Sequence, residues 1–181
     1  MDTFIFILEI IGTIAFASSG AMIAIEKKMD IFGVNVLGAT TAVGGGIMRD
    51  VILGLAPPTA FSKPVYILIA VVTSTILFAI AYVKMDAMRS ITKSEYYDRL
   101  MFWCDTAGLG IFTVVGIQTA SRMMQENNAF FFVFIGVLTG VGGGVLRDIM
   151  AGETPYILVK HIYACAAIAG GVVCVVSRNM L

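Results

Sequence analysis

The sequence is poor in charged residues for its length. Only 13% of its 181 residues are Asp, Glu, Lys or Arg, whereas an ordinary soluble domain has roughly 25%. Together with a hydrophobic content of 59%, this excludes a water-soluble fold and predicts an integral membrane protein with a single transmembrane domain, residues 1–181. The 12 basic residues are balanced by 12 acidic ones, so the charge gives no indication of a nucleic-acid partner.

The residues that metal binding and catalysis need are also scarce. The chain has 3 cysteines, in apolar runs and without C-x-x-C spacing, and 1 histidine, so no disulfide framework and no metal site are predicted. The glycine-rich segments lack the Gly-Lys-Ser/Thr of a P-loop and the last glycine of G-x-G-x-x-G. The sequence therefore predicts a protein without a cofactor that is not an enzyme.

Long apolar runs separated by short charged gaps predict an all-α fold that crosses the membrane several times. Each run is about 20 residues long, which is enough to span a bilayer. The expected helices lie near residues 4–25, 33–56, 64–83, 100–121, 130–151 and 156–176.

Basic residues predict the orientation of these spans. Most of the Lys and Arg residues fall in gaps on one side, which the positive-inside rule makes cytoplasmic. The N-terminus is then expected outside, and residues 84–99 are expected to form a cytoplasmic linker.

A motif occurs twice, three spans apart. Residues 44–50 read Gly-Gly-Gly-Ile-Met-Arg-Asp, and residues 142–148 read Gly-Gly-Gly-Val-Leu-Arg-Asp. A repeat with an odd number of spans places its two copies in opposite orientations, as in many transport proteins. We therefore expect an inverted repeat of two three-helix bundles, residues 1–83 and 100–181.

The glycines of the motif lie in the middle of predicted spans. Each glycine in a helix costs about 1 kcal/mol relative to alanine, so three in succession require a reason. One explanation is that helices 2 and 5 are broken there and expose backbone groups to a polar path. The alternative is close packing of helices through small residues. We expect the break, and with it a pathway lined by Gly44, Gly45, Gly46, Gly142, Gly143 and Gly144.

Arg49 and Arg147 place charge inside the membrane, at roughly 2.5 to 3.5 kcal/mol each on insertion scales. Adjacent helical residues do not face each other, so each arginine is expected to bind a carboxylate on another helix. At 1.5 Å per residue, Glu9 lies roughly 8 Å and Arg49 roughly 7 Å outward of the midpoints of their spans. Asp105 and Arg147 lie roughly 8 and 10 Å inward. Two pairs are predicted, Glu9 with Arg49 and Asp105 with Arg147.

The remaining polar residues of these spans have simpler expected roles. Asp50 and Asp148 follow the glycines, where they are expected to cap the start of a new half-helix or to contact a permeating ion. Ser19 is interpreted as a packing residue, and Tyr66 as part of the aromatic belt at the membrane surface.

The doubled motif, the stretch Ala-Phe-Ala-Ser-Ser-Gly-Ala at residues 15–21 and Asp-Ile-Phe-Gly at residues 30–33 resemble the bacterial branch of the TRIC family, the trimeric intracellular cation channels. The resemblance implies a homotrimer in the bacterial inner membrane, with one pore for potassium and sodium ions in each subunit. The family's motif positions fall on the six glycines and on Arg49, Asp50, Arg147 and Asp148. The family also implies a seventh helix, which is not evident in this sequence.

A second function remains open at this stage. The same family also resembles proteins described as transporters of small amino acids, particularly glycine. The sequence does not separate the two functions, because a broken helix can hold a substrate carboxylate at its N-terminus or coordinate a cation with its carbonyls. Arginines near the midplane suit an anionic group unless Glu9 and Asp105 neutralise them. The channel is the expected function and the carrier is the alternative.

Overall fold

The apolar runs form long helices. The computed structural model describes residues 2–83, 95–124, 128–159 and 161–180. Within these residues the secondary structure is entirely helical, which confirms the predicted all-α class. The helices are α1 (Asp2–Glu26), α2 (Ile31–Ile52), α3 (Thr59–Ser62), α4 (Val65–Val83), α6 (Glu95–Met123), α7 (Ala129–Met150), α8 (Tyr156–Val159) and α9 (His161–Met180).

Five helices of the described residues, α1, α2, α4, α6 and α7, are long and apolar enough to cross a membrane. The predicted sixth span is occupied by α8 and α9, which lie on either side of residue 160, outside the described residues. The apolar part of α9 is shorter, Cys165–Ser177.

Polar side chains begin the second helix of each half. Asp30 Oδ1 accepts a hydrogen bond of 2.8 Å from the backbone N–H of Gly33 at the start of α2. Asn128 Oδ1 accepts one of 3.0 Å from Phe131 at the start of α7. Such caps satisfy N–H groups that the first turn of a helix leaves without a partner.

The same two helices end on a glycine in the left-handed region. Gly54 follows α2 with a φ of 72°, and Gly152 follows α7 with a φ of 73°. The backbone N–H of the next residue bonds to the carbonyl of Asp50 in one half (2.8 Å) and of Asp148 in the other (2.9 Å). This Schellman arrangement needs a residue without a Cβ at the turn.

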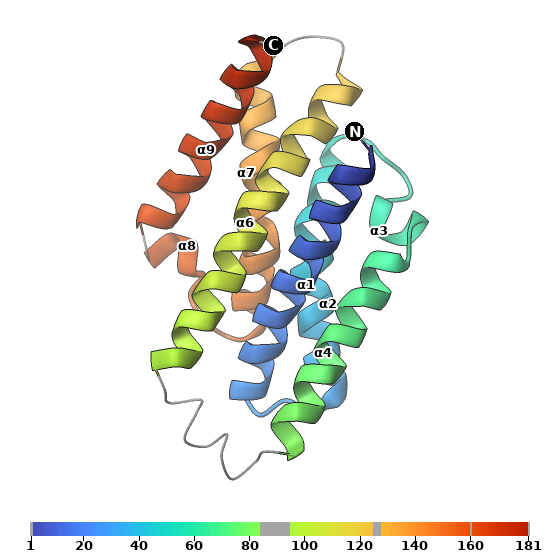
Figure 1. Ribbon diagram of the computed structural model, residues 1–181, viewed down its shortest axis with the longest axis vertical. Helices are drawn as coiled ribbons and strands as arrows, with labels where there is room; N and C mark the ends of the chain where they lie inside the picture. Colours follow the sequence, from blue (N-terminus) through green and yellow to red (C-terminus); the bar gives the residue numbers. More distant parts are fainter. Residues whose placement is uncertain (1, 84–94, 125–127, 160, 181) are drawn as a thin grey trace.

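Four helices form the centre of the molecule. α1 packs on α2 and on α6, and α7 packs on α6 and on α2. α4 covers α1 and α2 on one flank, and α9 covers α6 and α7 on the other. In Figure 1 α1 descends from the N-terminus while α6 ascends from the opposite end, as an inverted repeat requires.

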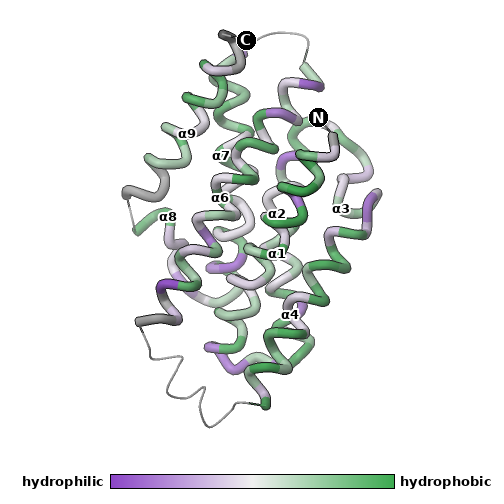
Figure 2. Tube along the Cα trace, viewed as in Figure 1, coloured by the Kyte–Doolittle hydropathy of each residue, from purple (hydrophilic) through white to green (hydrophobic). Residues whose placement is uncertain are grey.

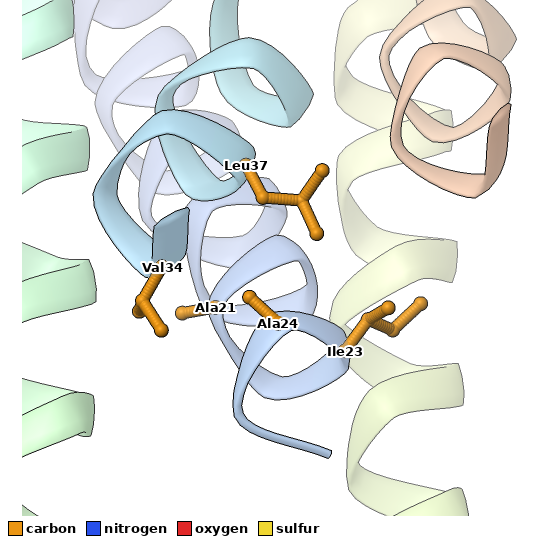
Figure 3. Close-up of a cluster of buried hydrophobic side chains, with 5 residues drawn as sticks. All are labelled: Ala21, Ile23, Ala24, Val34 and Leu37. Carbon is orange, nitrogen blue, oxygen red and sulfur yellow. The ribbon is translucent and has the colours of Figure 1, made fainter. Parts of the chain in front are cut away.

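Each half has its own apolar cluster, and the two clusters occupy equivalent places. Figure 3 shows the cluster between α1 and α2, in which Val34 and Leu37 lie beside three residues of α1. Its members are Ala21, Ile23, Ala24, Val34 and Leu37. The corresponding cluster of α6, α7 and α9 contains Ile117, Ala120, Phe132, Ile135 and Val175.

The outer surface of α4 is apolar, as a lipid environment requires. Figure 2 shows hydrophobic residues along most of this helix. Four of its exposed side chains recur every four residues, so they form one stripe along the helix. They are Leu68, Val72, Ile76 and Ile80.

Residues 84–94 of the predicted linker lie outside the described residues, but α6 begins at Glu95, so residues 95–99 are helical and the predicted boundary is wrong. The described residues contain no counterpart of the seventh helix.

Candidate functional site

α2 and α7 cross at the doubled glycines. A Cβ on Gly45 would collide with the carbonyl oxygen of Thr139, and a Cβ on Gly143 would collide with that of Thr41. Both helices continue through these residues without interruption. The predicted breaks are therefore wrong, and the alternative of close packing holds: contact between the two backbones offsets the low helix propensity of glycine.

The first glycine of each triplet also faces the opposite helix. A Cβ on Gly44 would lie 2.6 Å from Cδ1 of Leu146, and one on Gly142 would lie 3.0 Å from Sδ of Met48. These two positions therefore accommodate large apolar side chains from the other half.

The third glycine of each triplet has a different environment. A Cβ on Gly46 would meet only Nη2 of Arg49, at 3.8 Å, and one on Gly144 would meet only Nη2 of Arg147, at the same distance. Gly46 and Gly144 line cavities next to these arginines. The two glycines therefore border the polar space of the site and take no part in the helix crossing.

In the first half, the arginine and aspartate of the motif bind each other. Arg49 Nε lies 2.8 Å from Asp50 Oδ1, with both side chains buried. Asp50 Oδ2 accepts a hydrogen bond of 2.7 Å from the backbone N–H of Thr59, the first residue of α3. The prediction that these neighbours do not pair is wrong, because the long arginine side chain folds back over the end of the helix towards the aspartate.

The second half repeats this arrangement. Arg147 Nε lies 2.8 Å from Asp148 Oδ1, and Asp148 Oδ2 accepts a hydrogen bond of 2.7 Å from the backbone N–H of Tyr156, the first residue of α8. The aspartates therefore lie near the ends of α2 and α7 and cap the next short helix. The predicted capping of a half-helix inside the span is wrong.

Arg147 also binds a carboxylate on α6. Its Nη1 lies 2.5 Å from Asp105 Oδ1 and its Nη2 lies 3.3 Å from Asp105 Oδ2. Ser19 of α1 accepts a hydrogen bond from Arg147 Nη1 and donates one of 2.8 Å to Asp105. The pairing of Asp105 with Arg147, which depth alone predicts, is present in the structure.

The equivalent pair in the first half is not formed. Glu9 Oε2 accepts a hydrogen bond of 2.5 Å from the hydroxyl of Tyr66 on α4. Arg49 binds Asp50, and its Nη1 and Nη2 have no acceptor within the described part of the chain. The predicted pairing of Glu9 with Arg49 is therefore wrong, because the tyrosine competes for the carboxylate.

Two aromatic rings meet between the two charged regions. The centroids of Phe16 and Phe112 lie 5.3 Å apart with an interplanar angle of 31°. A Cβ on Gly108 would collide with Phe16, and one on Gly12 would lie 3.0 Å from Phe112. Each ring therefore packs where the equivalent glycine of the other half leaves space, and both occupy the centre of the molecule.

Cavities reach the motif from both sides but differ greatly in size. A cavity of about 280 Å³ is bordered by Glu9 and Arg49, and a smaller one of about 40 Å³ continues from them to Gly46 and Phe112. In the second half only about 10 Å³ remains beside Asp105 and Arg147. The described space beside the arginine of the motif is therefore larger in the first half than in the second.

Sequence reasoning missed several members of the site. Ser19 lies at about the depth of Asp105, roughly 7 Å inward of the midpoint of its span, so the depth argument that selects Asp105 could have found it. Tyr66 has no such signal, because an aromatic residue near the end of a span is common at membrane interfaces. The described residues contain no group of three side chains able to hold a metal ion.

A family model and curated relatives match nearly the whole chain. The model described as glycine transporter matches residues 6–82 and 102–179, one segment in each half. The inner membrane protein YadS of Escherichia coli (strain K12) is 40% identical over 170 residues, which cover 92% of this chain and 75% of the relative. A membrane protein of Vibrio cholerae is 34% identical over 177 residues, 95% of this chain and 68% of the relative.

Solved structures give the same result. The TRIC trimeric intracellular cation channel orthologue from Rhodobacter sphaeroides matches with a TM-score of 0.86 and 32% identity, over 98% of this chain and 86% of that one. A prokaryotic TRIC channel in 0.5 M KCl matches with a TM-score of 0.83 and 34% identity, over 95% and 82%. The chain belongs to the family that the glycine transporter model describes, the bacterial TRIC family.

Proposed function

We propose that this chain is a monovalent cation channel, conducting potassium and sodium ions, with one pore in each subunit of a homotrimer. The observation that carries the proposal is the TM-score of 0.86 over 98% of the chain with a TRIC cation channel orthologue. In this proposal the protein lies in the bacterial inner membrane with its N-terminus outside, and YadS is an inner membrane protein by name.

The charges of the two motif regions favour a cation. Four carboxylates, Glu9, Asp50, Asp105 and Asp148, accompany two guanidinium groups, a formal excess of two negative charges. Buried charges in a membrane protein are costly and usually mark the path of an ion or substrate. A cation moving between the two regions would find carboxylates on both sides of the centre.

The proposed path passes between Phe16 and Phe112. It leads from the cavity of about 280 Å³ past Glu9 and Arg49 to the two rings, and continues on the other side to Gly144, Asp105 and Arg147. Because the rings of Phe16 and Phe112 lie on this path and the cavity beside Asp105 and Arg147 measures only about 10 Å³, this structure corresponds to a closed channel in our proposal.

Planar bilayer recording of the purified protein tests this function. We expect unitary currents in potassium chloride whose reversal potential follows the potassium gradient, and fewer openings for Arg147→Gln, which removes the fork that binds Asp105. Lys28→Gln, at an exposed lysine just after α1, serves as the control. Chemical crosslinking in membranes tests the trimer.

A second candidate is secondary transport of glycine or another small amino acid, favoured by the description of the matching family model. Uptake of labelled glycine into liposomes, made from the same preparation, separates the two. Saturable uptake without unitary currents would contradict the channel, whereas currents without uptake would contradict the carrier.

A further inference from the structure

α1 and α6 have equivalent places in the inverted repeat. Glu9 corresponds to Asp105 and Gly20 to Gly116, with the same difference in residue number. The structure agrees with this alignment: a Cβ on Gly20 would collide with α2, and a Cβ on Gly116 would collide with the equivalent part of α7. Each residue of α1 can therefore be compared with its counterpart in α6.

One end of this helix pair borders the large cavity of the first half. The cavity of about 280 Å³ is lined there by Ile5 and Glu9 of α1 and by Val115, Gln118 and Thr119 of α6. We call this the open end of the pair. In the proposed function it is the place where a cation enters the path from one side of the membrane.

The other end of the pair has the same positions in a different state. The counterparts of the cavity residues are Met101 and Asp105 of α6 and Ser19, Met22 and Ile23 of α1. The three residues of α1 are at most 5% exposed, and Met101 packs against the apolar cluster that contains Ile23. We call this the packed end, because α1 and α6 are in contact where their counterparts border a cavity.

Two hydroxyl groups join α1 to the second half at the packed end. Tyr97 of α6, which is 5% exposed, donates a hydrogen bond of 2.5 Å to the backbone carbonyl of Met22. Ser19 donates one of 2.8 Å to Asp105 and accepts one from Arg147. Water can replace such bonds at a small net cost, so they can hold two helices together and still be broken reversibly.

The sequence itself makes the two ends different. The counterpart of Ser19 at the open end is Val115, which lines the same cavity as Glu9 and Arg49. A valine has no hydroxyl with which to join α6 to the charged residues of the first half. The asymmetry between the ends therefore includes a difference in residue type as well as a difference in conformation.

We propose that the packed end is the second mouth of the pore and that the hydroxyls of Tyr97 and Ser19 hold it closed. This inference rests on the proposed channel, because a pore needs an entrance on each side of the membrane. The first mouth is the open end, and an inverted repeat places its counterpart on the other side. Asp105 belongs both to the packed end and to the cavity of about 10 Å³ on the proposed path, so an opening there would lead onto that path.

Tyr97 and Ser19 act in this proposal as positioning residues. α1 belongs to the first half and α6 and α7 to the second, so the mouth opens when the two halves move relative to each other. Asp105 then loses the hydroxyl of Ser19 and keeps the fork of Arg147. For this reason, removal of the Ser19 hydroxyl should favour opening, whereas Arg147→Gln, which breaks the fork, should reduce it.

Labelling of cysteines with a charged methanethiosulfonate tests the position of the mouth. Ile23 and Thr119 are counterparts, and only Thr119 lines the large cavity. In lipid nanodiscs, where the reagent reaches both faces, we expect Thr119→Cys to react about tenfold or more faster than Ile23→Cys, because a buried thiol reacts slowly. Mass spectrometry of the labelled peptides separates these sites from the 3 native cysteines.

Two conservative variants test the hydroxyls. When Tyr97→Phe or Ser19→Ala is added to Ile23→Cys, the labelling rate should rise about two- to tenfold, the effect of one hydrogen bond on an opening equilibrium. Tyr82→Phe, at an exposed tyrosine of α4, and Ser18→Ala, whose hydroxyl bonds to a carbonyl of its own helix, are the matched controls and should leave the rate unchanged.

Two results would overturn the proposal. One is that Ile23→Cys reacts as fast as Thr119→Cys in the otherwise unaltered chain. The other is that neither Tyr97→Phe nor Ser19→Ala changes the labelling rate.

Recording in planar bilayers adds a measurement that a loss of packing would not reproduce. Tyr97→Phe and Ser19→Ala should raise the ratio of open to closed time by the same factor of about two to ten and leave the unitary current unchanged. Faster labelling in a protein without currents would contradict the channel while supporting the opening between α1 and α6. Currents in a protein with unchanged labelling would contradict the second mouth alone.

Discussion

Asp105 and Arg147 face each other in a forked ion pair. Nη1 lies 2.5 Å from Oδ1 and Nη2 lies 3.3 Å from Oδ2, and the side chains are 10% and 3% exposed. Their counterparts Glu9 and Arg49 stay apart, since Glu9 binds Tyr66 instead. The two halves therefore have an acidic and a basic residue at equivalent positions, but only in the second half do the two side chains form an ion pair.

Because of this difference, we expect two matched substitutions to lower the free energy of unfolding by unequal amounts. Asp105→Asn leaves the buried guanidinium of Arg147 with one carboxylate fewer, and we expect a loss of about 3 kcal/mol in the free energy of unfolding. Glu9→Gln weakens one hydrogen bond from Tyr66 and should cost about 1 kcal/mol. Denaturation in detergent micelles measures both, and equal losses would contradict the structure.

The helix crossing predicts a pattern among the glycines. Gly45→Ala and Gly143→Ala place a Cβ against a carbonyl oxygen, where backbone cannot move easily, and we expect each to cost about 1 to 3 kcal/mol. Gly46→Ala and Gly144→Ala meet only an arginine Nη2 at 3.8 Å and should be neutral or stabilise by up to about 1 kcal/mol. Thermal unfolding of the four variants in detergent checks this order. Destabilisation by Gly46→Ala as large as that by Gly45→Ala would contradict it.

If the chain is a channel, as we propose, the rings of Phe16 and Phe112 should limit its conduction. Phe112→Ala removes one partner of the contact with Phe16, whose centroids lie 5.3 Å apart. We expect a higher open probability or larger unitary current in planar bilayers. Phe102→Ala, at an exposed position of the same helix, is the control. Unchanged currents in a folded Phe112→Ala protein would place the constriction elsewhere.

An ion pair outside the membrane predicts a dependence on alkaline pH. Lys27 Nζ lies 2.6 Å from Glu153 Oε1 and links the loop after α1 to the loop after α7. The hydrogen bond to Glu153 raises the pKa of Lys27 above its ordinary value of 10.5. A raised folded-state pKa means that this stabilisation is fully present below pH 10.5 and is lost as the pH rises through the folded-state pKa.

The measurement is the thermal midpoint of wild type and Glu153→Gln between pH 8 and strongly alkaline pH. The difference between the two should be small at pH 8, because both side chains are largely exposed, and should vanish above the folded-state pKa of Lys27. Lys28→Gln, at the exposed neighbouring lysine, serves as the control. A difference that grows with rising pH would contradict the assignment.

The sequence allows the helices and the inverted repeat to be predicted because both depend on local information. Apolar runs of about 20 residues identify spans, and the doubled motif at residues 44–50 and 142–148 identifies the repeat. The pairing of Asp105 with Arg147 follows from depth along two helices, which the sequence also contains.

The errors concern relations between helices or at their ends. The triplet at residues 44–46 is compatible with a break or with a crossing, and only the position of α7 decides between them. The depth of Glu9 matches Arg49, but depth does not show that Tyr66 of α4 is within reach of the carboxylate. The bond between Arg49 and Asp50 depends on how a long side chain folds at the end of α2, which periodicity does not describe.

The turns that follow α2 and α7 restrict how the molecule can change its shape. Each aspartate of the motif holds the arginine of its own helix and the first N–H of the following short helix, and a left-handed glycine fixes the turn between them. In each half the long helix and the turn that follows it therefore behave as one rigid body. We then expect a change of shape to occur at the glycine crossing, where the two backbones touch and where Leu146 and Met48 are the large side chains packed against glycines of the other half.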